Sequence, residues 1–384
     1  MEAVYLARQA GWETAVIDQD PGAPARALAE EFHHINLLTN RRRARSVFKE
    51  FDLVVPATEN HDVLVWLNEN VPFMDIPLAL DLNSYNISCS KAKSNRLFAL
   101  SGILMPEPWP ECGFPVIVKP SNMSGSAGVE KVVDHSYLTA LLNRLGKDVV
   151  IQKFLDGPSY SLEVIADRGR CTPLQVTELK FDAGYDCKRV IAGPGTGRKV
   201  EKEFLALGSR ITSAINLSGI MDIEVIETEG TLKVLEIDAR LPSQTPSAVY
   251  HSTGINMIEM LGNYWINGRL PEKRLFTGMR RAVIYEHLRF RHGKLAVAGE
   301  HVITGAQGLK VYKGEFSADV MISNYEHSPD DWVATTIYTG KTEADTWEVR
   351  NKAIDKILQD FRVRKYSDTN PFEEGVPGYD QVVL

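Results

Sequence analysis

A predicted β-hairpin in the middle of the chain carries three acidic side chains. Alternating apolar residues predict strands at 221–226 and 234–240, and the short connection 228–231 predicts antiparallel pairing that places Glu224 beside Glu236. Glu236 and Asp238 are two residues apart and therefore share a face. Three carboxylates on one face repel one another unless a cation lies among them, and their oxygens suit Mg²⁺ bound to nucleotide phosphates. A surface ladder of salt bridges is the alternative, which the interleaved apolar residues disfavour.

Arg240 has the same strand parity as Glu236 and Asp238, so we expect it to point into the same space. A guanidinium group in that position could bind the phosphate being transferred through two parallel N–H donors.

A second apolar strand, at 114–119, ends in Lys119 and is followed by a proline. A lysine at the end of such a strand faces a cavity, where its compact charge suits phosphate oxygens. The loop 121–129 that follows is rich in small residues, among them Ser124, Gly125 and Ser126, whose backbone N–H groups could wrap a triphosphate. Taken singly, these features also fit a surface lysine and an ordinary turn.

The apolar segment 150–157 runs into a turn and could line a purine, reading its edge with backbone groups while aliphatic side chains cover its faces. An ordinary core strand is the alternative for this segment.

The order of elements indicates a layered α/β chain. Helices at 1–10 and 24–31 alternate with strands at 14–18 and 53–56, which predicts a parallel sheet that lacks the usual opening strand and Gly-rich turn. A helix at 91–101 ends at Gly102 near a domain boundary. The strands that follow it suggest two facing sheets, and a long helix is predicted at 343–361.

Composition narrows the function classes. A chain of 384 residues with 44% hydrophobic residues can bury a core in two or three domains. It contains no apolar run of the roughly 18 residues that span a bilayer and begins without a signal-peptide pattern, so we expect a cytoplasmic protein without membrane partners. The formal charge of -7 argues against nucleic-acid binding, and the basic run 41–45 is interpreted as a solvated helix start. Four scattered cysteines support neither a zinc site nor a disulfide framework.

Together these motifs resemble the ATP-grasp family, over nearly all of the chain. The resemblance implies an α/β fold, α+β in its central domain, and ATP and Mg²⁺ as cofactors. It implies a Rossmann-like domain at 1–88 without its first strand, an ATP-grasp domain at 89–270 with a nucleotide-binding lid at about 105–155, and a C-terminal domain at 271–384.

The resemblance also implies roles for individual residues. Gln152 stands where many members have Glu, Ser159 stands where several have a ribose-binding Glu, and Asp238 replaces the usual Asn. The implied roles are nucleotide binding by Lys91, Lys119, Ser124, Gly125, Ser126, Gln152, Lys153 and Leu155, metal binding by Glu224, Glu236 and Asp238, and catalysis by Lys119 and Arg240.

Within the family, the chain most resembles the pyrrolysine-biosynthesis branch, whose members join an ornithine-type carboxylate to the side-chain amine of lysine. The likeness is carried by segments 2–6, 88–95, 157–165, 185–190 and 236–246, which lie in loops and strand ends. A cationic substrate needs acidic partners, so Glu163 is the first candidate, ahead of Asp182 and Asp186. Other small substrates such as D-alanine or bicarbonate, a catalytically silent nucleotide-binding protein, and a homodimer all stay open. The substrate-binding residues expected are Ser161, Glu163, Arg240, Ser243 and Gln244.

Overall fold

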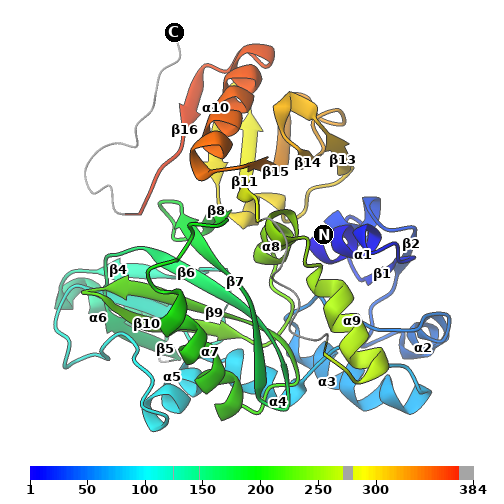
Figure 1. Cartoon of the computed structure of the whole chain (residues 1–384). Coiled ribbons are helices and arrows are strands. Elements are labelled where there is room, and N and C mark those ends of the chain that lie inside the picture. The colour runs from blue at the N-terminus through cyan, green and yellow to red at the C-terminus, as the bar shows by residue number, and fades with distance from the viewer. Residues whose placement is uncertain (124, 147, 271–279, 372–384) are drawn as a thin grey trace.

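The computed structural model describes residues 1–123, 125–146, 148–270 and 280–371. Its N-terminal region contains a short parallel sheet (Figure 1). Its strands β1 (Ala15–Asp18) and β2 (Glu31–His34) follow α1 (Glu2–Gln9), in the alternating order that the sequence predicts. The comparison with a Rossmann-like domain stays a prediction. The further helices here are α2 (Arg41–Phe48), α3 (His61–Asn70), η2 (Pro72–Met74) and α4 (Leu82–Ser88).

Two elements predicted in this region are wrong. The helix expected at 24–31 is reduced to a 3₁₀ turn, η1 (Pro24–Ala27), because Glu31 begins β2 and its backbone N–H donates to the Thr14 carbonyl at 3.1 Å. Strand pairing there overrides the helix propensity of the segment. The strand expected at 53–56 is reduced to one parallel bridge between Val54 and Leu78, and Pro56 has no N–H with which to extend a ladder.

A small antiparallel sheet follows the helix α5 (Lys91–Leu100). Its strands run in the order β4 (Glu130–Val132), β3 (Val116–Pro120) and β5 (Val149–Lys153). The helix α6 (His135–Leu145) covers one face of this sheet (Figure 1), where its leucines bury the valines of β3.

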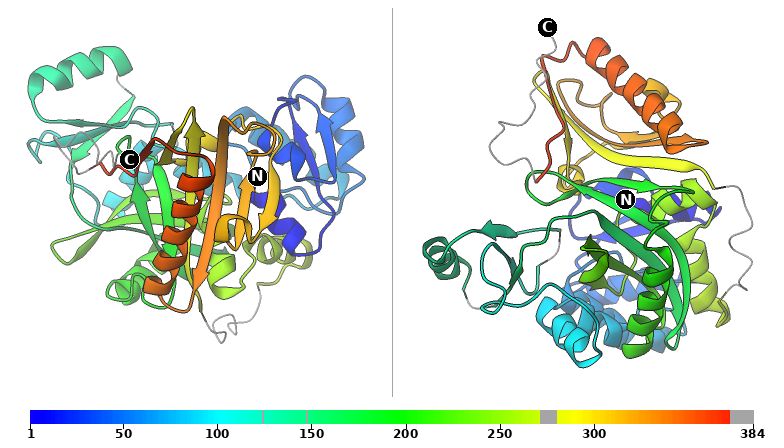
Figure 2. Two further views of the ribbon diagram at one scale, coloured as in Figure 1. Left: turned by 90° about the horizontal axis from the view of Figure 1, so that it is seen from above. Right: turned by 60° about the vertical axis from the view of Figure 1, so that its left-hand side comes forward.

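A large sheet of eleven strands is the main element of the remaining described residues (Figures 1 and 2). α7 (Glu201–Ala214) covers the back of its central strands, and α8 (Thr245–Thr253) and α9 (Met257–Asn267) connect it to the N-terminal region. In sheet order the main strands are β10 (Thr231–Asp238), β9 (Gly219–Thr228), β6 (Ser159–Asp167), β7 (Arg170–Phe181), β8 (Cys187–Ala192), β11 (Ala282–Arg291), β15 (Asp331–Gly340), β14 (Val320–Ser323) and β13 (Lys310–Lys313), while β12 (Lys294–Ala298) pairs with β11 and β16 (Lys365–Ser367).

The long helix predicted at 343–361 is confirmed as α10 (Glu343–Asp360). It begins with a capping box in which the Thr342 side chain accepts from the Asp345 N–H and the Asp345 side chain accepts from the Thr342 N–H. Two short turns, η4 (Glu300–Ile303) and η5 (Glu315–Ser317), complete the C-terminal part.

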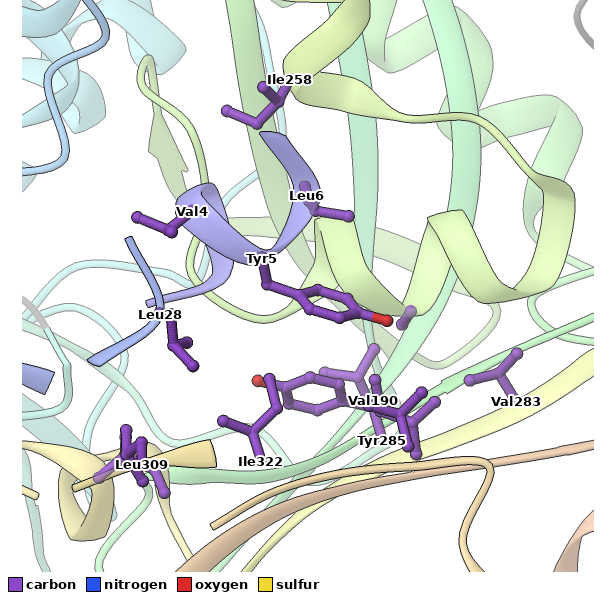
Figure 3. Close-up of a cluster of buried hydrophobic side chains, with 14 of the residues drawn as sticks. Val4, Tyr5, Leu6, Leu28, Val190, Ile258, Val283, Tyr285, Leu309 and Ile322 are labelled. Atoms are coloured by element: carbon purple, nitrogen blue, oxygen red, sulfur yellow. The ribbon is translucent and has the colours of Figure 1, made fainter. Parts of the chain in front are cut away.

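One apolar cluster joins distant parts of the chain (Figure 3). Tyr5 and Leu6 of α1 pack with Val190 of β8 and Tyr285 of β11, so the first helix is held against the large sheet. The Tyr285 hydroxyl also donates to the Glu2 carboxylate at 2.7 Å. β8 and β11 are adjacent in one continuous sheet, so a domain boundary near residue 270 stays a prediction.

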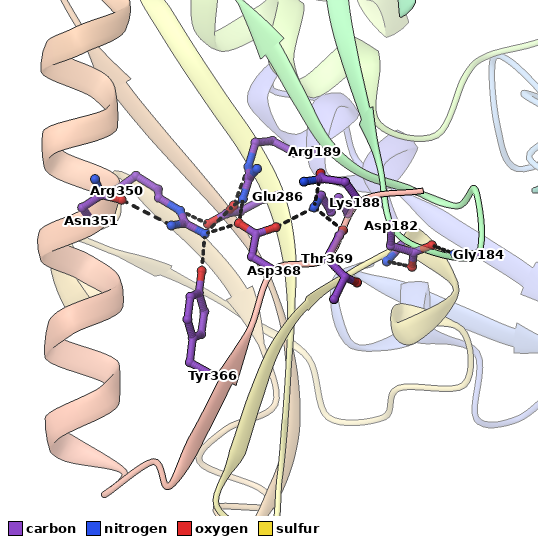
Figure 4. Close-up of polar contacts among 12 residues, drawn as sticks. Asp182, Gly184, Lys188, Arg189, Glu286, Arg350, Asn351, Tyr366, Asp368 and Thr369 are labelled. Carbon is purple, nitrogen blue, oxygen red and sulfur yellow. Dashed lines mark hydrogen bonds and ion pairs between the residues drawn. The ribbon is translucent and has the colours of Figure 1, made fainter. Parts of the chain in front are cut away.

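A buried charged network holds the end of the described chain (Figure 4). Glu286 of β11 is fully buried between Arg189 at 2.6 Å and Arg350 of α10 at 2.8 Å. Asp368, just beyond β16, accepts from Lys188 at 2.6 Å and from Arg189 at 2.7 Å. Removing one member of such a network leaves a buried charge without its counterion, so the network fixes the C-terminal segment against β8. Among the described residues, none of the helices is long and apolar enough to cross a membrane.

Candidate active site

The predicted acidic hairpin is present, and a β-bulge gives it its orientation. β9 and β10 meet at a tight turn in which Glu229 and Gly230 both have positive φ, at 53° and 73°. Val234 pairs with Val225, but the next pair joins Glu236 to Glu224, so Leu235 is the extra residue. A bulge reverses the alternation of a strand. Val234 therefore faces the core behind the sheet, whereas Glu236 faces the opposite side together with Glu224.

The bulge also aligns a second pair of carboxylates on the same face. Asp238 is the partner of Asp222, two residues beyond the pair Glu236 and Glu224. The prediction that Glu224, Glu236 and Asp238 share one face agrees with this register. Their role as metal ligands stays a prediction.

Cationic side chains contact these carboxylates. Lys91 Nζ, at the start of α5, lies 2.8 Å from Glu236 Oε1, and Arg240 lies 2.7 Å from Asp238 Oδ2. Lys119 Nζ reaches the carbonyl of the bulged Leu235 at 3.5 Å. Positive charge thus gathers at the end of the hairpin face, and polyphosphate binding there stays a prediction.

Burial and repulsion raise the proton affinity of the acidic group. Burial, reinforced by Glu236 and opposed by Lys119, raises the pKa of Glu224 to about 7. Burial raises the pKa of Asp238 to about 7 as well, against the opposing effect of Arg240. Burial lowers the pKa of Lys119, and Glu236 opposes that shift. A divalent cation bound among these carboxylates would stabilise their ionised form and so lower their pKa values.

The fit to Mg²⁺ rests on donor type and placement. Within the part of the chain that the structure describes, no group of three His, Cys, Asp or Glu side chains is already drawn together as a metal site. Instead, the Lys91 and Arg240 ion pairs occupy Glu236 and Asp238. Oxygen ligands on neighbouring strands are the donors that Mg²⁺ prefers. A bound nucleotide would draw the Lys91 and Arg240 side chains toward its phosphates and so release the carboxylates.

The small-residue loop after β3 lies over this charged group. Gly125 and Ser126 have positive φ, at 58° and 57°, and the Ser126 hydroxyl donates to the Tyr185 carbonyl at 2.5 Å. A Cβ atom on Gly125 would come within 2.6 Å of the His301 ring, so a side chain there is doubly disfavoured. Ser124 lies outside the described residues.

The predicted adenine-binding segment forms one wall of the same cleft. Gln152 is buried and pairs through a bridge with Pro108, and Lys153 N–H donates to the Glu107 carbonyl at 2.8 Å. Lys153 and Leu155 line the cleft beside Gln152.

The cleft lies between the small sheet and the large one. It encloses about 910 Å³ including its open mouth, within the range of cofactor sites. Its apolar walls, Ile117 of β3 and Ile226 of β9, come from the two sheets, which confirms that they face each other. The predicted site residues that line it are Lys91, Lys119, Ser126, Gln152, Lys153, Leu155, Glu224 and Glu236.

The predicted substrate residues lie farther along the same side. Ser161 is the partner of Glu224 on β6 and donates to Glu163 at 2.8 Å. Ser243 and Gln244, before α8, both donate to Glu300, the former at 2.5 Å and the latter at 3.0 Å. They are thus held together close to β8, where Gln244 also donates to the Cys187 carbonyl at 3.1 Å.

The two weaker acidic candidates shape their own loop. Asp182 accepts from the Gly184 and Gly299 N–H groups at 2.8 and 3.0 Å, and Asp186 accepts from His301 Nδ1 at 2.7 Å. Their oxygens are engaged in these contacts, so their role in substrate binding stays the weaker prediction.

The sequence reasoning missed three acids. Asp222 is buried on the site face, and its spacing of two from Glu224 could have revealed it. Glu59 pairs with Arg240, and Glu300 accepts from Ser243 and Gln244. These two come from remote segments and carry no signal in the sequence around them.

Two facing sheets around a cleft, with lysines, a small-residue loop and an acidic hairpin at one end, define an ATP-grasp enzyme. The model of the ATP-grasp domain matches residues 89–244. The chain belongs to the ATP-grasp family.

Among individual proteins, the chain is 32% identical to the 3-methyl-D-ornithine--L-lysine ligase of Methanosarcina mazei over 361 residues, which cover 94% of this chain and 93% of that protein. The enzyme of the same name from Methanosarcina acetivorans is also 32% identical, over 93% of both chains.

Solved structures agree on the fold. A biotin carboxylase from Campylobacter jejuni superposes with a TM-score of 0.71 at 14% identity, over 92% of this chain and 88% of that one. An L-amino acid ligase from Bacillus licheniformis superposes with a TM-score of 0.64 at 17% identity, over 92% and 94% of the two chains. A third match, the biotin carboxylase domain of the Hydrogenobacter thermophilus 2-oxoglutarate carboxylase, was crystallised as a dimer with MgADP and bicarbonate; it superposes with a TM-score of 0.68 at 15% identity, over 93% of this chain and 86% of that one.

Proposed function

We propose that the chain joins the carboxylate of 3-methyl-D-ornithine, or of D-ornithine, to the side-chain amine of L-lysine with ATP, as a step of pyrrolysine biosynthesis. One observation carries the proposal: the paired carboxylates Glu224 and Glu236 meet Lys91 and Lys119 at the end of a nucleotide-sized cleft. The full-length similarity to ligases of that name supports this choice of substrates.

The reaction has two steps. A carboxylate oxygen of the ornithine-type substrate attacks the γ-phosphorus of ATP, and the bond from that phosphorus to the β-γ bridging oxygen breaks. ADP departs, and the substrate is now an acyl phosphate. The lysine amine then attacks the acyl carbon, phosphate departs, and the amine proton is lost to give the amide.

The residues of the chain act by position and charge. Lys119 and Lys91 neutralise phosphate oxygens, and Arg240 binds the group in transfer and the charge that develops as the amide forms. Glu224, Glu236 and Asp238 would hold Mg²⁺, which would supply positive charge to neutralise phosphate oxygens. The cleft wall with Gln152, Lys153 and Leu155 receives the adenine, and the loop with Ser124, Gly125 and Ser126 covers the phosphates. The amino-acid substrates contact Ser161, Glu163, Arg240, Ser243 and Gln244.

Measuring how ADP release depends on the amino-acid substrate tests the proposal. Purified protein receives MgATP, lysine and either D-ornithine or its 3-methyl form, and separate reactions contain D-alanine or bicarbonate. We expect ADP and an amide product only with the diamino acids. Turnover with D-alanine alone would assign the dipeptide-ligase branch, and turnover with bicarbonate would assign the carboxylase branch.

A Glu236→Ala variant checks the site assignment. We expect it to lose turnover while its melting curve keeps a single cooperative transition, because Glu236 is half-exposed and bears no core packing. The control Glu50→Ala, exposed in the N-terminal region, should keep full activity. Wild-type activity in the Glu236 variant would refute the metal and phosphate assignment, and loss of activity in both would indicate a general effect.

The domain division at 88 and 270, the homodimer and the cytoplasmic location belong to the same proposal. A reaction that consumes ATP is consistent with that location. Gel filtration with light scattering measures the oligomeric state directly.

A further inference from the structure

Two parallel rows of side chains cross the strands on the site face. One row runs from Glu236 through Glu224 to Ser161, and its first two members line the nucleotide cleft. The other runs from Asp222 through Glu163 to Gln175, which are consecutive partners on β9, β6 and β7. We call this second group the acceptor row.

The acceptor row consists of buried hydrogen-bond acceptors. Glu163 is 0% exposed, Gln175 4% and Asp222 8%. Gln175 Oε1 and Asp222 Oδ1 are buried atoms without a hydrogen-bond partner in the described ranges, and Glu163 Oε2 has only the Thr245 hydroxyl beside it. Native proteins rarely leave such atoms unpaired, and each unpaired one destabilises the fold.

The surrounding contacts fix which atoms remain free. The Ser252 hydroxyl of α8 donates its single hydrogen to the Arg281 carbonyl at 2.8 Å, so it must accept from Gln175 Nε2 at 2.9 Å. That contact turns the Gln175 oxygen away from Ser252. The Ser161 hydroxyl donates to Glu163 Oε1 at 2.8 Å, which leaves Oε2 with the single hydroxyl of Thr245 and room for a further donor.

Three acceptors, two of them carboxylates, call for a cation with three donors. A primary ammonium group has three N–H donors in a compact positive head, whereas a water molecule has two donors and no charge. Burial raises the pKa of Glu163 to about 8, against the opposing Ser161 hydroxyl, as expected for an acid whose cation is absent.

We propose that the acceptor row of Asp222, Glu163 and Gln175 binds the side-chain ammonium of the diamino-acid substrate and selects it. The proposal rests on the function proposed above and names what recognises one end of that substrate.

Spacing separates the side-chain ammonium from the α-ammonium. Successive residues on one face of a strand are about 6.6 Å apart, so the acceptor row lies that far beyond the row that holds Glu224. The α-ammonium of an amino acid is one carbon from its reacting carboxylate. The side-chain ammonium of ornithine is four carbons away and can span the two rows.

The test compares substrates that lack one amine each. ADP release with saturating lysine and MgATP is measured for D-ornithine, for D-norvaline, which lacks the side-chain amine, and for 5-aminopentanoate, which lacks the α-amine. Wild-type kcat/KM should fall roughly 10- to 100-fold for D-norvaline, the loss of a charge-assisted contact. Glu163→Gln should raise KM for D-ornithine and 5-aminopentanoate by a similar factor while kcat/KM for D-norvaline changes less than about threefold.

Two controls separate recognition from folding. Asp167→Asn removes a carboxylate of equal parity from the same strand and should keep the preference for D-ornithine. Glu163→Gln should melt at or above the wild-type temperature in the presence of MgADP, because it lacks the buried carboxyl group that destabilises the wild type as pH rises. A Gln175→Leu variant, which removes the neutral acceptor, should weaken D-ornithine binding in the same direction but less.

The outcomes separate a failure of the ammonium-binding role from a failure of the proposed ligase function. If Glu163→Gln loses kcat/KM equally for D-ornithine and D-norvaline, or still prefers D-ornithine over D-norvaline as the wild type does, the role of the acceptor row is wrong. The ligase assignment would stand in either case. A wild-type enzyme that turns over no diamino acid would overturn both.

Discussion

Replacing Glu163 by Gln should flatten the dependence of protein stability on pH in the ligand-free state. Below pH 4.5 both the folded and the unfolded chain carry a proton on this side chain. Between pH 4.5 and about 8 the folded protein keeps the proton that the unfolded chain has lost, so the free energy of unfolding falls as pH rises. Above that window both forms are ionised and the loss is complete.

The size of the effect follows from the shift. Each pH unit within the window lowers the free energy of unfolding by about 1.4 kcal/mol, so a shift from 4.5 to about 8 corresponds to a loss on the order of 4 to 5 kcal/mol. Because Glu163 is 0% exposed, solvent screens little of this. Gln cannot ionise, so the stability of the variant lacks this pH-dependent loss.

Urea denaturation at pH 5.0, 6.5 and 8.0 measures the effect. We expect the wild type to lose stability over this range and Glu163→Gln to lose about 3 to 4 kcal/mol less, with Glu50→Gln, an exposed acid, following the wild type. Parallel curves for the wild type and Glu163→Gln would contradict this prediction, because they would mean that Glu163 ionises normally in the folded protein.

Further substitutions address the phosphate site. Lys119→Met should lower kcat for ADP release by roughly 10²- to 10³-fold, since it removes a preorganised charge beside the transferring group, while the melting temperature holds or rises because a buried charge is lost. Arg240→Lys should lower kcat more than it raises KM for ATP, because lysine cannot make two parallel bonds to a phosphate; an unchanged kcat would contradict this role. Deleting Leu235 should close the bulge into a regular ladder in which Val234 and Glu236 still face opposite sides, so Glu236 stays beside Glu224 and turnover persists; loss of turnover in a stably folded variant would show that the bulge itself is needed to orient the site.

Much of the site could be predicted because its signals are local. Glu236 and Asp238 share a face through the spacing of two in a strand, and the short turn brings Glu224 beside Glu236. Lys119 lies at the end of a buried strand and lines the cleft as expected. Asp222 obeys the same spacing rule as Glu236, so the sequence contained the information to find it.

The bulge could not be predicted from alternation. Val234 and Glu236 are both even positions of one strand, and simple alternation puts them on the same face. The extra residue Leu235 separates them instead, because apolar Val234 pairs with Val225 in the core while Glu236 pairs with Glu224. Burial of the apolar side chain decides the register.

Contacts between remote segments also lie beyond the sequence. Lys91 and Glu236 are 145 positions apart, and Arg240 and Glu59 are 181 apart, so only the folded chain brings each pair together. The error at 24–31 has a similar origin, since pairing of Glu31 with β1 overrides the helix propensity of its neighbours.

A crystal structure of the protein with ADP and Mn²⁺ in place of Mg²⁺ would show whether Glu224 and Glu236 hold the metal. Anomalous scattering locates the metal without assumptions about its ligands. We expect a peak about 2.0 to 2.2 Å from carboxylate oxygens of Glu224 and Glu236, with the Lys91 ammonium moved from Glu236 to a phosphate oxygen. A nucleotide bound in the cleft with the metal peak remote from both carboxylates would contradict it.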